Sequence, residues 1–210
     1  MTGKVRVAGL VLAAGLGTRM AGGSKLLREV GGSALVRRAA KALREGGVSP
    51  VIAVVGRDGE PVRRALAGLA DYFAVNPEPA RGMGYSLAMG AAALPPGASA
   101  LAVLPGDMPL LKPSTVALLI EAHLDNPGKI IVPVHQARRG HPVLFPMPLF
   151  LADLKAARGD RGGRDILASH PESLAEIETN DPGVLIDVDT EEELLVLRED
   201  RKLFKGKCPC

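Results

Sequence analysis

Aromatic side chains are scarce in this sequence: tryptophan is absent, and aromatic residues make up 3% of the 210 residues. Proteins that hold single-stranded nucleic acid stack its bases on aromatic rings, so this composition argues against a nucleic-acid partner. The net charge of +3 suits an anionic ligand in general. We therefore expect a small anionic ligand.

Cysteine is rarer still. The two cysteines, Cys208 and Cys210, stand in the terminal KGKCPC, where a disulfide would have nothing to join and a zinc site would lack further ligands. We expect residues 201–210 to be a tail without a structural role. The first half-dozen residues lack the architecture of a signal peptide. No apolar run approaches the roughly 18 residues of a membrane span, so we expect a cytoplasmic protein without a membrane partner.

The chain length suits one substantial domain over residues 1–200. Apolar runs at 7–13, 51–55, 72–75, 98–104 and 130–134 predict buried strands. Helical patterns follow at 33–47, 61–69, 86–94, 113–124 and 149–157, with Ser33 and Ser86 as starts. This alternation predicts a mostly parallel sheet with right-handed crossovers.

Glycines and cations follow the first strand immediately. Glycines let backbone N–H groups approach a ligand closely, and the basic side chains supply positive charge, so this loop suits a polyphosphate. The spacing fits neither a dinucleotide fingerprint nor a P-loop. The residues concerned are Gly15, Gly17, Thr18, Arg19, Gly22, Gly23, Ser24 and Lys25.

The same stretch resembles a family signature, LxxGxxxRMGxxK, with Leu12, Gly15, Arg19, Met20 and Lys25 in place and one extra residue, Ala21. The signature belongs to nucleotidyltransferases with a GT-A-like fold, and the likeness is closest to molybdenum-cofactor cytidylyltransferases and other MobA-like NTP transferases. The resemblance implies a three-layer α/β/α domain, Rossmann-like in its first half. It also implies a nucleotide site that includes Leu12, Ala13, Ala14, Gly15, Gly17, Thr18, Arg19 and Lys25, the last two being catalytic.

Asp107 lies in PGDMP, directly after the strand predicted to end at Leu104. Ligands of open α/β sheets bind beyond the carboxyl ends of strands, so this carboxylate points into the crevice. Mg²⁺ prefers one or two carboxylates plus substrate phosphates, and the stretch resembles the family's metal-binding strand end. Asp107 is therefore predicted to be a catalytic metal ligand, although capping the following turn is the alternative.

Three later stretches resemble the family in the same order. NPEPARGMGYS implies nucleotide contacts from Asn76, Gly82 and Ser86. RRGHP and GDRGGRDIL imply acceptor contacts from Arg139, His141, Asp160 and Arg164, against the alternative of solvated loops. Arg139 can hold a phosphate as a two-pronged fork.

Near the end of the chain, Asp187 and Asp189 alternate along an expected strand, which would place both carboxylates on one face. Such a pair repels unless a cation compensates, so Asp187 is predicted to be a second metal ligand. Thr190 and Glu193 form a capping box before the final helix.

Together the motifs predict transfer of CMP from CTP to the terminal phosphate of molybdopterin, with Mg²⁺ as cofactor, pyrophosphate as the leaving group and a molybdoenzyme as recipient of the product. Positioning and charge do most of the work in such transfers, which accords with the lack of a nucleophilic triad. Ala14 favours CTP over GTP, because the guanylyl branch has glycine there. A sugar-1-phosphate nucleotidyltransferase and a non-catalytic carrier of the cofactor remain alternatives. A nicotinamide-dependent oxidoreductase ranks last because the glycine spacing does not match.

Overall fold

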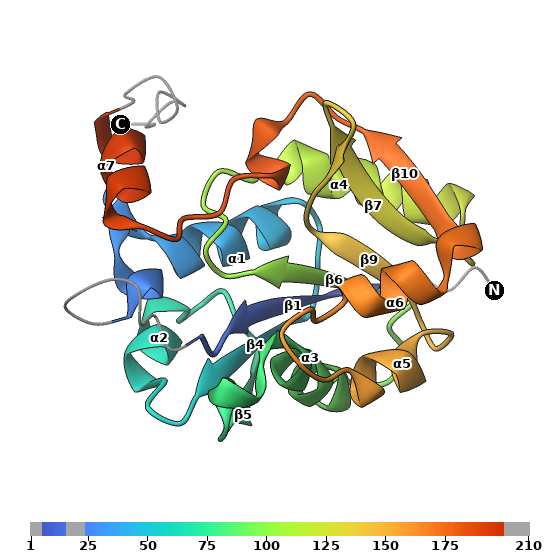
Figure 1. The fold of residues 1–210 in the computed structure, drawn as a ribbon, viewed down its shortest axis with the longest axis horizontal. Helices are drawn as coiled ribbons and strands as arrows, with labels where there is room; N and C mark the ends of the chain where they lie inside the picture. The colour runs from blue at the N-terminus through green and yellow to red at the C-terminus, as the bar shows by residue number, and fades with distance from the viewer. Residues whose placement is uncertain (1–5, 16–23, 200–210) are drawn as a thin grey trace.

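The computed structural model describes residues 6–15 and 24–199. A central sheet runs in the strand order β10-β7-β9-β6-β1-β4-β5, with β8 paired to β7 (Figure 1). The strands are β1 (Val7–Ala13), β4 (Val51–Gly56), β5 (Tyr72–Asn76), β6 (Ala100–Pro105), β7 (Ile130–His135), β8 (Arg138–Arg139), β9 (Val143–Pro146) and β10 (Leu174–Glu178).

Most neighbours in this sheet are parallel. β1 pairs in parallel with β4 and β6, β4 with β5, and β7 with β10. β9 is the exception inside the sheet, because it runs antiparallel to both β6 and β7. The predicted mostly parallel sheet is confirmed, and the ends of the strands predicted from apolar runs agree with the observed ones to within two residues.

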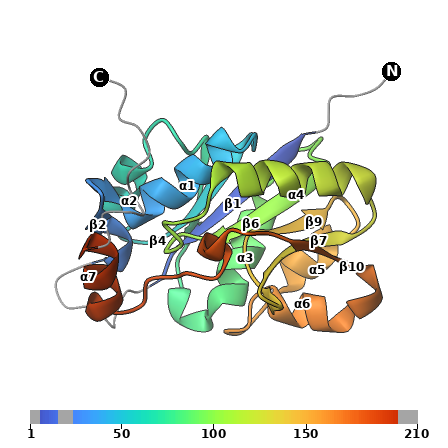
Figure 2. The same cartoon turned by 90° about the horizontal axis from the view of Figure 1, so that it is seen from above.

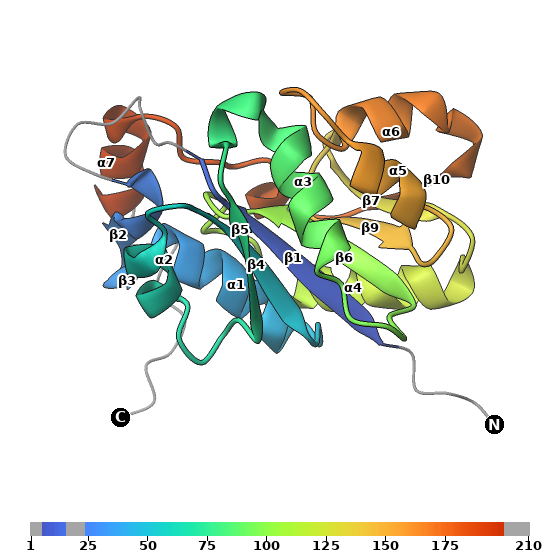
Figure 3. The same cartoon turned by 90° about the horizontal axis from the view of Figure 1, so that it is seen from below.

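Helices cover both faces of the sheet (Figures 2 and 3). One face carries α1 (Leu35–Glu45), α2 (Glu60–Ala65) and α4 (Pro113–Asp125), and the other carries α3 (Met83–Ala92), α5 (Leu151–Ala156) and α6 (Arg164–Ser169). Successive side chains of a strand point to opposite faces, so Val11 enters the α1 layer while Leu10 enters the α3 layer. The three-layer prediction is confirmed.

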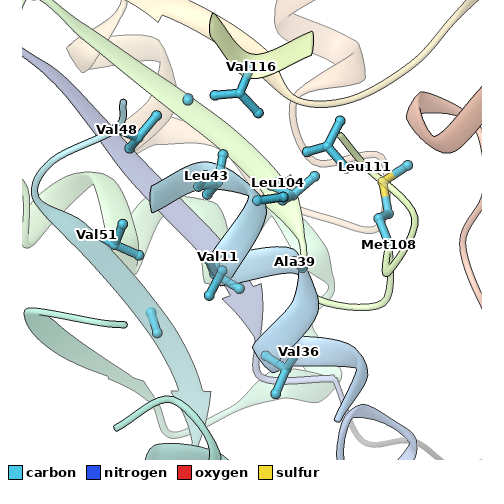
Figure 4. Packing of buried hydrophobic residues seen from close by; sticks show 14 of the residues in the cluster. Val11, Val36, Ala39, Leu43, Val48, Val51, Leu104, Met108, Leu111 and Val116 are labelled. Atoms are coloured by element: carbon cyan, nitrogen blue, oxygen red, sulfur yellow. The ribbon is translucent and has the colours of Figure 1, made fainter. Parts of the chain in front are cut away.

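The α1 layer shows why these apolar runs fold together. Val11 and Leu104 of adjacent strands meet Ala39 and Leu43 of α1, and Val116 of α4 closes the cluster (Figure 4). Close packing of these branched side chains removes their surface from water. Each Å² of apolar surface that is buried stabilises the fold by about 25 cal/mol. This core holds the carboxyl ends of β1 and β6 side by side.

Smaller elements complete the chain. β2 (Glu29–Val30) and β3 (Ser33–Ala34) form a hairpin against α7 (Glu191–Glu199), with Val30, Leu194 and Leu197 buried between them. Short 3-10 turns lie at Lys25–Leu27, Pro79–Arg81, Pro171–Ser173 and Pro182–Val184. Among the described residues no helix has the length and apolar character needed to cross a membrane.

Three local predictions were wrong. Ser33 does not cap the first helix but lies in β3, so that α1 begins at Leu35. Ser86 does not start α3, which begins at Met83, immediately after Gly82 at φ 93°. Residues 185–189 pair with no strand of the sheet. A backbone hydrogen bond from Val188 to Asp107 holds Asp187 and Asp189 instead.

Candidate active site

A cleft of about 1010 Å³ opens beyond the carboxyl ends of β1 and β6. Its size and position match those of ligand sites in open α/β sheets. The walls come from the end of β1, the start of α3, the segment between β8 and β9, the loop before α6 and residues 184–189.

Lys25 lies at the centre of one half of this cleft. Its ammonium group donates to Asp107 Oδ2 at 2.7 Å and to Asp189 Oδ1 at 2.6 Å. Burial lowers the pKa of Lys25, but its ion pairs with Asp107 and Asp189 outweigh that effect and raise the pKa above its ordinary value. The ammonium group therefore remains charged at neutral pH.

Backbone hydrogen bonds hold Asp107 in place. After β6, Gly106 N–H donates to the Leu12 carbonyl at 2.9 Å, which ties the loop to β1. Val188 N–H donates to the Asp107 carbonyl at 3.0 Å. Because Asp187 and Asp189 flank Val188, this one bond brings both of their carboxyl groups to the wall that carries Asp107.

The carboxylates of this half repel one another. Partial burial raises the pKa of Asp187, and the negative charges of Asp107 and Asp189 raise it further. A cation placed here would relieve the repulsion.

The donor set fits Mg²⁺. Asp107 Oδ1 is buried and has no hydrogen-bond partner among the described residues. Exposed Asp187 lies on the same wall of the cleft. The described parts of the chain contain no group of three or more His, Cys, Asp or Glu side chains that could hold a metal ion. Mg²⁺ does not need such a cage, because it binds one or two carboxylates together with substrate phosphates.

The neighbouring wall is formed by Ser86 of α3 and by Gly82, the residue just before this helix. Gly82 leaves no room for a side chain, since a Cβ there would lie 2.5 Å from the Gly159 backbone. Gly84 N–H donates to the Gly159 carbonyl at 2.8 Å, which fixes the start of α3 against the loop that carries Asp160.

The other half of the cleft is basic and carries His141, Arg139, Arg161 and Arg164, together with Asp160. Burial, followed by the charge of Arg164, lowers the pKa of His141 to about 4, so its imidazole is neutral at pH 7. Its Nδ1 is buried and has no partner among the described residues.

The two neighbouring arginines differ in their pairing. Arg139 donates to Glu176 Oε1 on β10 at 2.6 Å. No hydrogen bond or ion pair of the Arg164 guanidinium occurs within residues 6–15 and 24–199. A ligand anion must compete with Glu176 for Arg139 but not for Arg164.

The structure brings most of the predicted site residues into one cleft. These are Leu12, Ala14, Gly15, Lys25, Gly82, Ser86, Asp107, Arg139, His141, Asp160, Arg164 and Asp187. Ala13 and Asn76 are buried behind the wall instead. Gly17, Thr18 and Arg19 lie outside the described residues, as do Cys208 and Cys210.

Asp189 and Arg161 are among the cleft residues that sequence reasoning missed. Asp189 was noted only as a neighbour of Asp187, yet it is the second carboxylate on Lys25. Arg161 adds charge to the basic half and pairs with Asp165 at 2.9 Å. Its place in the basic run DRGGR could have singled it out.

Known proteins resemble this chain in sequence and in fold. Residues 9–174 match the model of the MobA-like NTP transferase domain. Nicotine blue oxidoreductase from Paenarthrobacter nicotinovorans is 34% identical over 196 residues, covering 90% of this chain and 94% of that protein. The bifunctional protein GlmU of Geobacter metallireducens is 34% identical over 118 residues, covering 56% of this chain but only 25% of the longer GlmU.

A similar fold occurs in Rv0371c from Mycobacterium tuberculosis H37Rv. The two structures match with a TM-score of 0.79 at 26% identity, covering 93% of this chain and 99% of the other. A second structure of Rv0371c is a complex with manganese, matching with a TM-score of 0.77 at 25% identity.

Proposed function

Because the chain belongs to the MobA-like NTP transferase family, we propose that it transfers CMP from CTP to the terminal phosphate of molybdopterin, as a step in molybdenum cofactor biosynthesis. A phosphate oxygen of the acceptor forms a bond to the α-phosphorus of CTP. The bond from that phosphorus to the bridging oxygen of the β-phosphate breaks, and pyrophosphate leaves with the electron pair.

The observation that carries this proposal is one cleft that contains both the Lys25–carboxylate cluster and a group of basic side chains. The half beside Gly15 contains Lys25 between Asp107 and Asp189, and the other half contains Arg164 beside His141. The first suits a triphosphate with a divalent cation, and the second suits an anionic acceptor.

Each group has a separate role in this scheme. Asp107, with Asp187 beside it, would hold Mg²⁺, which supplies positive charge against the phosphate oxygens when bound. Lys25 adds a fixed ammonium group against the charge that develops on the leaving pyrophosphate. Arg164 orients the acceptor phosphate, because its guanidinium can bind two phosphate oxygens at once. No protein nucleophile is needed.

Ala14 supports the choice of CTP over GTP. It is 3% exposed and lines the nucleotide half, so its methyl group narrows the space available to a base. A purine there would meet overpacking costs of about 1–3 kcal/mol. We expect Ala14→Gly to reduce the preference for CTP over GTP about tenfold, measured as the ratio of the two kcat/KM values.

The test of the proposed function is pyrophosphate release from CTP with Mg²⁺ and molybdopterin. We expect release to require both substrates and the metal, and to fall when GTP replaces CTP. Release that proceeds equally well with GTP would contradict the assignment of the nucleotide. No release with either nucleotide would contradict the transfer reaction itself.

A second candidate follows from the relative named as an oxidoreductase, which aligns with 90% of this chain. Under this alternative the same cleft would hold a redox cofactor and an organic substrate. Oxidation of NADH or NADPH by the purified protein with a quinone-like acceptor would favour this function. The Lys25–Asp107 pair favours the transferase, because hydride transfer does not require a triphosphate site.

A further inference from the structure

Asn76 was predicted to contact the nucleotide, but the structure places it behind the wall. It is the last residue of β5, it is 0% exposed, and it does not line the cleft. Ser86, one helical turn into α3, does line the cleft and is 7% exposed. Asn76 Nδ2 lies 2.9 Å from Ser86 Oγ.

The direction of this hydrogen bond is fixed by a third group. The backbone N–H of Glu78 donates to Asn76 Oδ1 at 2.8 Å. A backbone N–H can only donate, so the oxygen of the Asn76 amide must face Glu78 and its NH₂ must face Ser86. Ser86 Oγ therefore accepts the bond from Asn76.

A hydroxyl that accepts from one partner keeps its own proton for another. Within the described parts of the chain, the Ser86 hydroxyl donates to no other group. Ser86 borders the cleft, so this proton can reach an acceptor atom of a bound ligand. We propose that Asn76 is a positioning residue that holds the Ser86 hydroxyl as a hydrogen-bond donor toward the nucleoside part of the nucleotide, an inference that rests on the proposed function.

The sheet order indicates why the partner is the nucleoside and not the phosphates. Asn76 ends β5, and its hydrogen bond holds Ser86 near that end. β5 lies three strands away from β6, so at the usual strand spacing the ends of these two strands are roughly 14 Å apart. Lys25 and Asp107 gather the phosphates beyond β1 and β6. A nucleotide that extends from them toward α3 presents its sugar and base to Ser86, and the uncharged oxygen and nitrogen acceptors of a pyrimidine suit such a donor.

The test compares binding of CTP and of inorganic tripolyphosphate, both with Mg²⁺, by calorimetry. Ser86→Ala removes the donor, and we expect its affinity for CTP to fall about tenfold. Asn76→Asp keeps the shape of the side chain but replaces its NH₂ group by an oxygen. The Ser86 hydroxyl would then donate to this carboxylate and turn its lone pairs to the ligand. We expect this variant to lose about thirtyfold, because repulsion replaces an attraction. Affinity for tripolyphosphate should change less than about twofold in both.

The double variant separates positioning from simple damage. If Asn76 acts through Ser86, Asn76→Asp with Ser86→Ala should bind CTP as well as Ser86→Ala alone, so the second substitution rescues part of the loss. Additive losses, or full affinity in Asn76→Asp, would overturn the inference. Equal losses for CTP and tripolyphosphate would also overturn it, since they indicate a general disturbance of the cleft.

A further variant covers the case in which Asn76→Asp does not fold. Asn76→Ala leaves the Ser86 hydroxyl free to rotate, and we expect about threefold weaker CTP binding that disappears in the Ser86→Ala background. Unchanged binding in Asn76→Ala would overturn the inference. If the unsubstituted protein binds tripolyphosphate but not CTP, the proposed function fails and this inference fails with it.

Discussion

The backbone N–H of Val188 donates to the carbonyl oxygen of Asp107 at 3.0 Å, joining the C-terminal segment to the loop after β6. This bond takes the place of the strand that we expected around Asp187 and Asp189. It places Asp189 against Lys25 and Asp187 on the wall of the cleft. The half of the cleft around Lys25 is thus assembled from parts of the chain that lie far apart in sequence.

Asp107 and Asp189 both bind Lys25, but only Asp107 has an unpartnered buried oxygen for a metal. We expect Asp107→Asn to lower kcat for pyrophosphate release more than about 100-fold, because a metal ligand is lost with the charge. Asp189→Asn is the matched control and should lower kcat about tenfold. Steady-state kinetics with varied Mg²⁺ tests this. Equal losses in both variants would mean that Asp107 acts only through Lys25.

Asp181 anchors the segment that leads to Val188. Its buried carboxylate accepts from Lys112 N at 2.9 Å, Thr115 Oγ1 at 2.7 Å and Gly183 N at 3.0 Å. We expect Asp181→Ala to lower the free energy of unfolding by about 3 kcal/mol, because three donors lose their partner. Urea denaturation measures this. Asp125→Ala, at an exposed site on α4, is the control and should change stability by less than about 0.5 kcal/mol.

Gly15 offers a way to test the cleft without damaging the fold. A Cβ built on Gly15 meets no atom of the described residues within 4 Å, so alanine is compatible with the described fold but enters the space that we assign to the nucleotide. We expect Gly15→Ala to keep the melting temperature within about 2 °C and to weaken CTP binding about tenfold. Gly128→Ala is the control, because its Cβ also meets open space and it does not line the cleft. Undiminished CTP binding by Gly15→Ala would show that the nucleotide does not approach this backbone.

His141 predicts a pH dependence of stability. Burial and the charge of Arg164 hold its pKa at about 4, below the ordinary value of 6.5. Between these values the unfolded chain binds a proton that the folded chain does not, so stability falls as the pH drops from 6.5 to 4. We expect a loss of about 2 kcal/mol over this range. Urea denaturation at several pH values should show a smaller loss for His141→Gln, and an identical profile would assign the acid sensitivity to other groups.

Much of the fold follows from local patterns. β1 and β6 are continuous apolar runs, so their ends and the position of Asp107 after β6 were predictable. The capping box was also confirmed, since Glu193 Oε2 accepts from Thr190 N at 3.0 Å and Glu193 N donates to Thr190 Oγ1 at 3.2 Å.

Other features depend on contacts that no local pattern encodes. The insertion of β9 between β6 and β7 is a matter of tertiary packing, because a buried antiparallel strand looks the same in sequence as a parallel one. Asn76 reads as a polar loop residue, yet Glu78 and Ser86 satisfy its amide inside the protein. Arg139 could not be known to pair with Glu176 until β10 was placed beside β7.

The reversed direction of β9 has a consequence for how such enzymes diversify. Val143, at its start, pairs with Val103 near the end of β6, so the chain enters β9 at the same edge of the sheet where it leaves β1 and β6. The segment before β9 carries Arg139 and His141 of the basic half, and neither residue takes part in the pairings around β1. Under the proposed function, substitutions in this segment would alter the half of the cleft that receives the acceptor and leave the strand pairings beside the nucleotide unchanged.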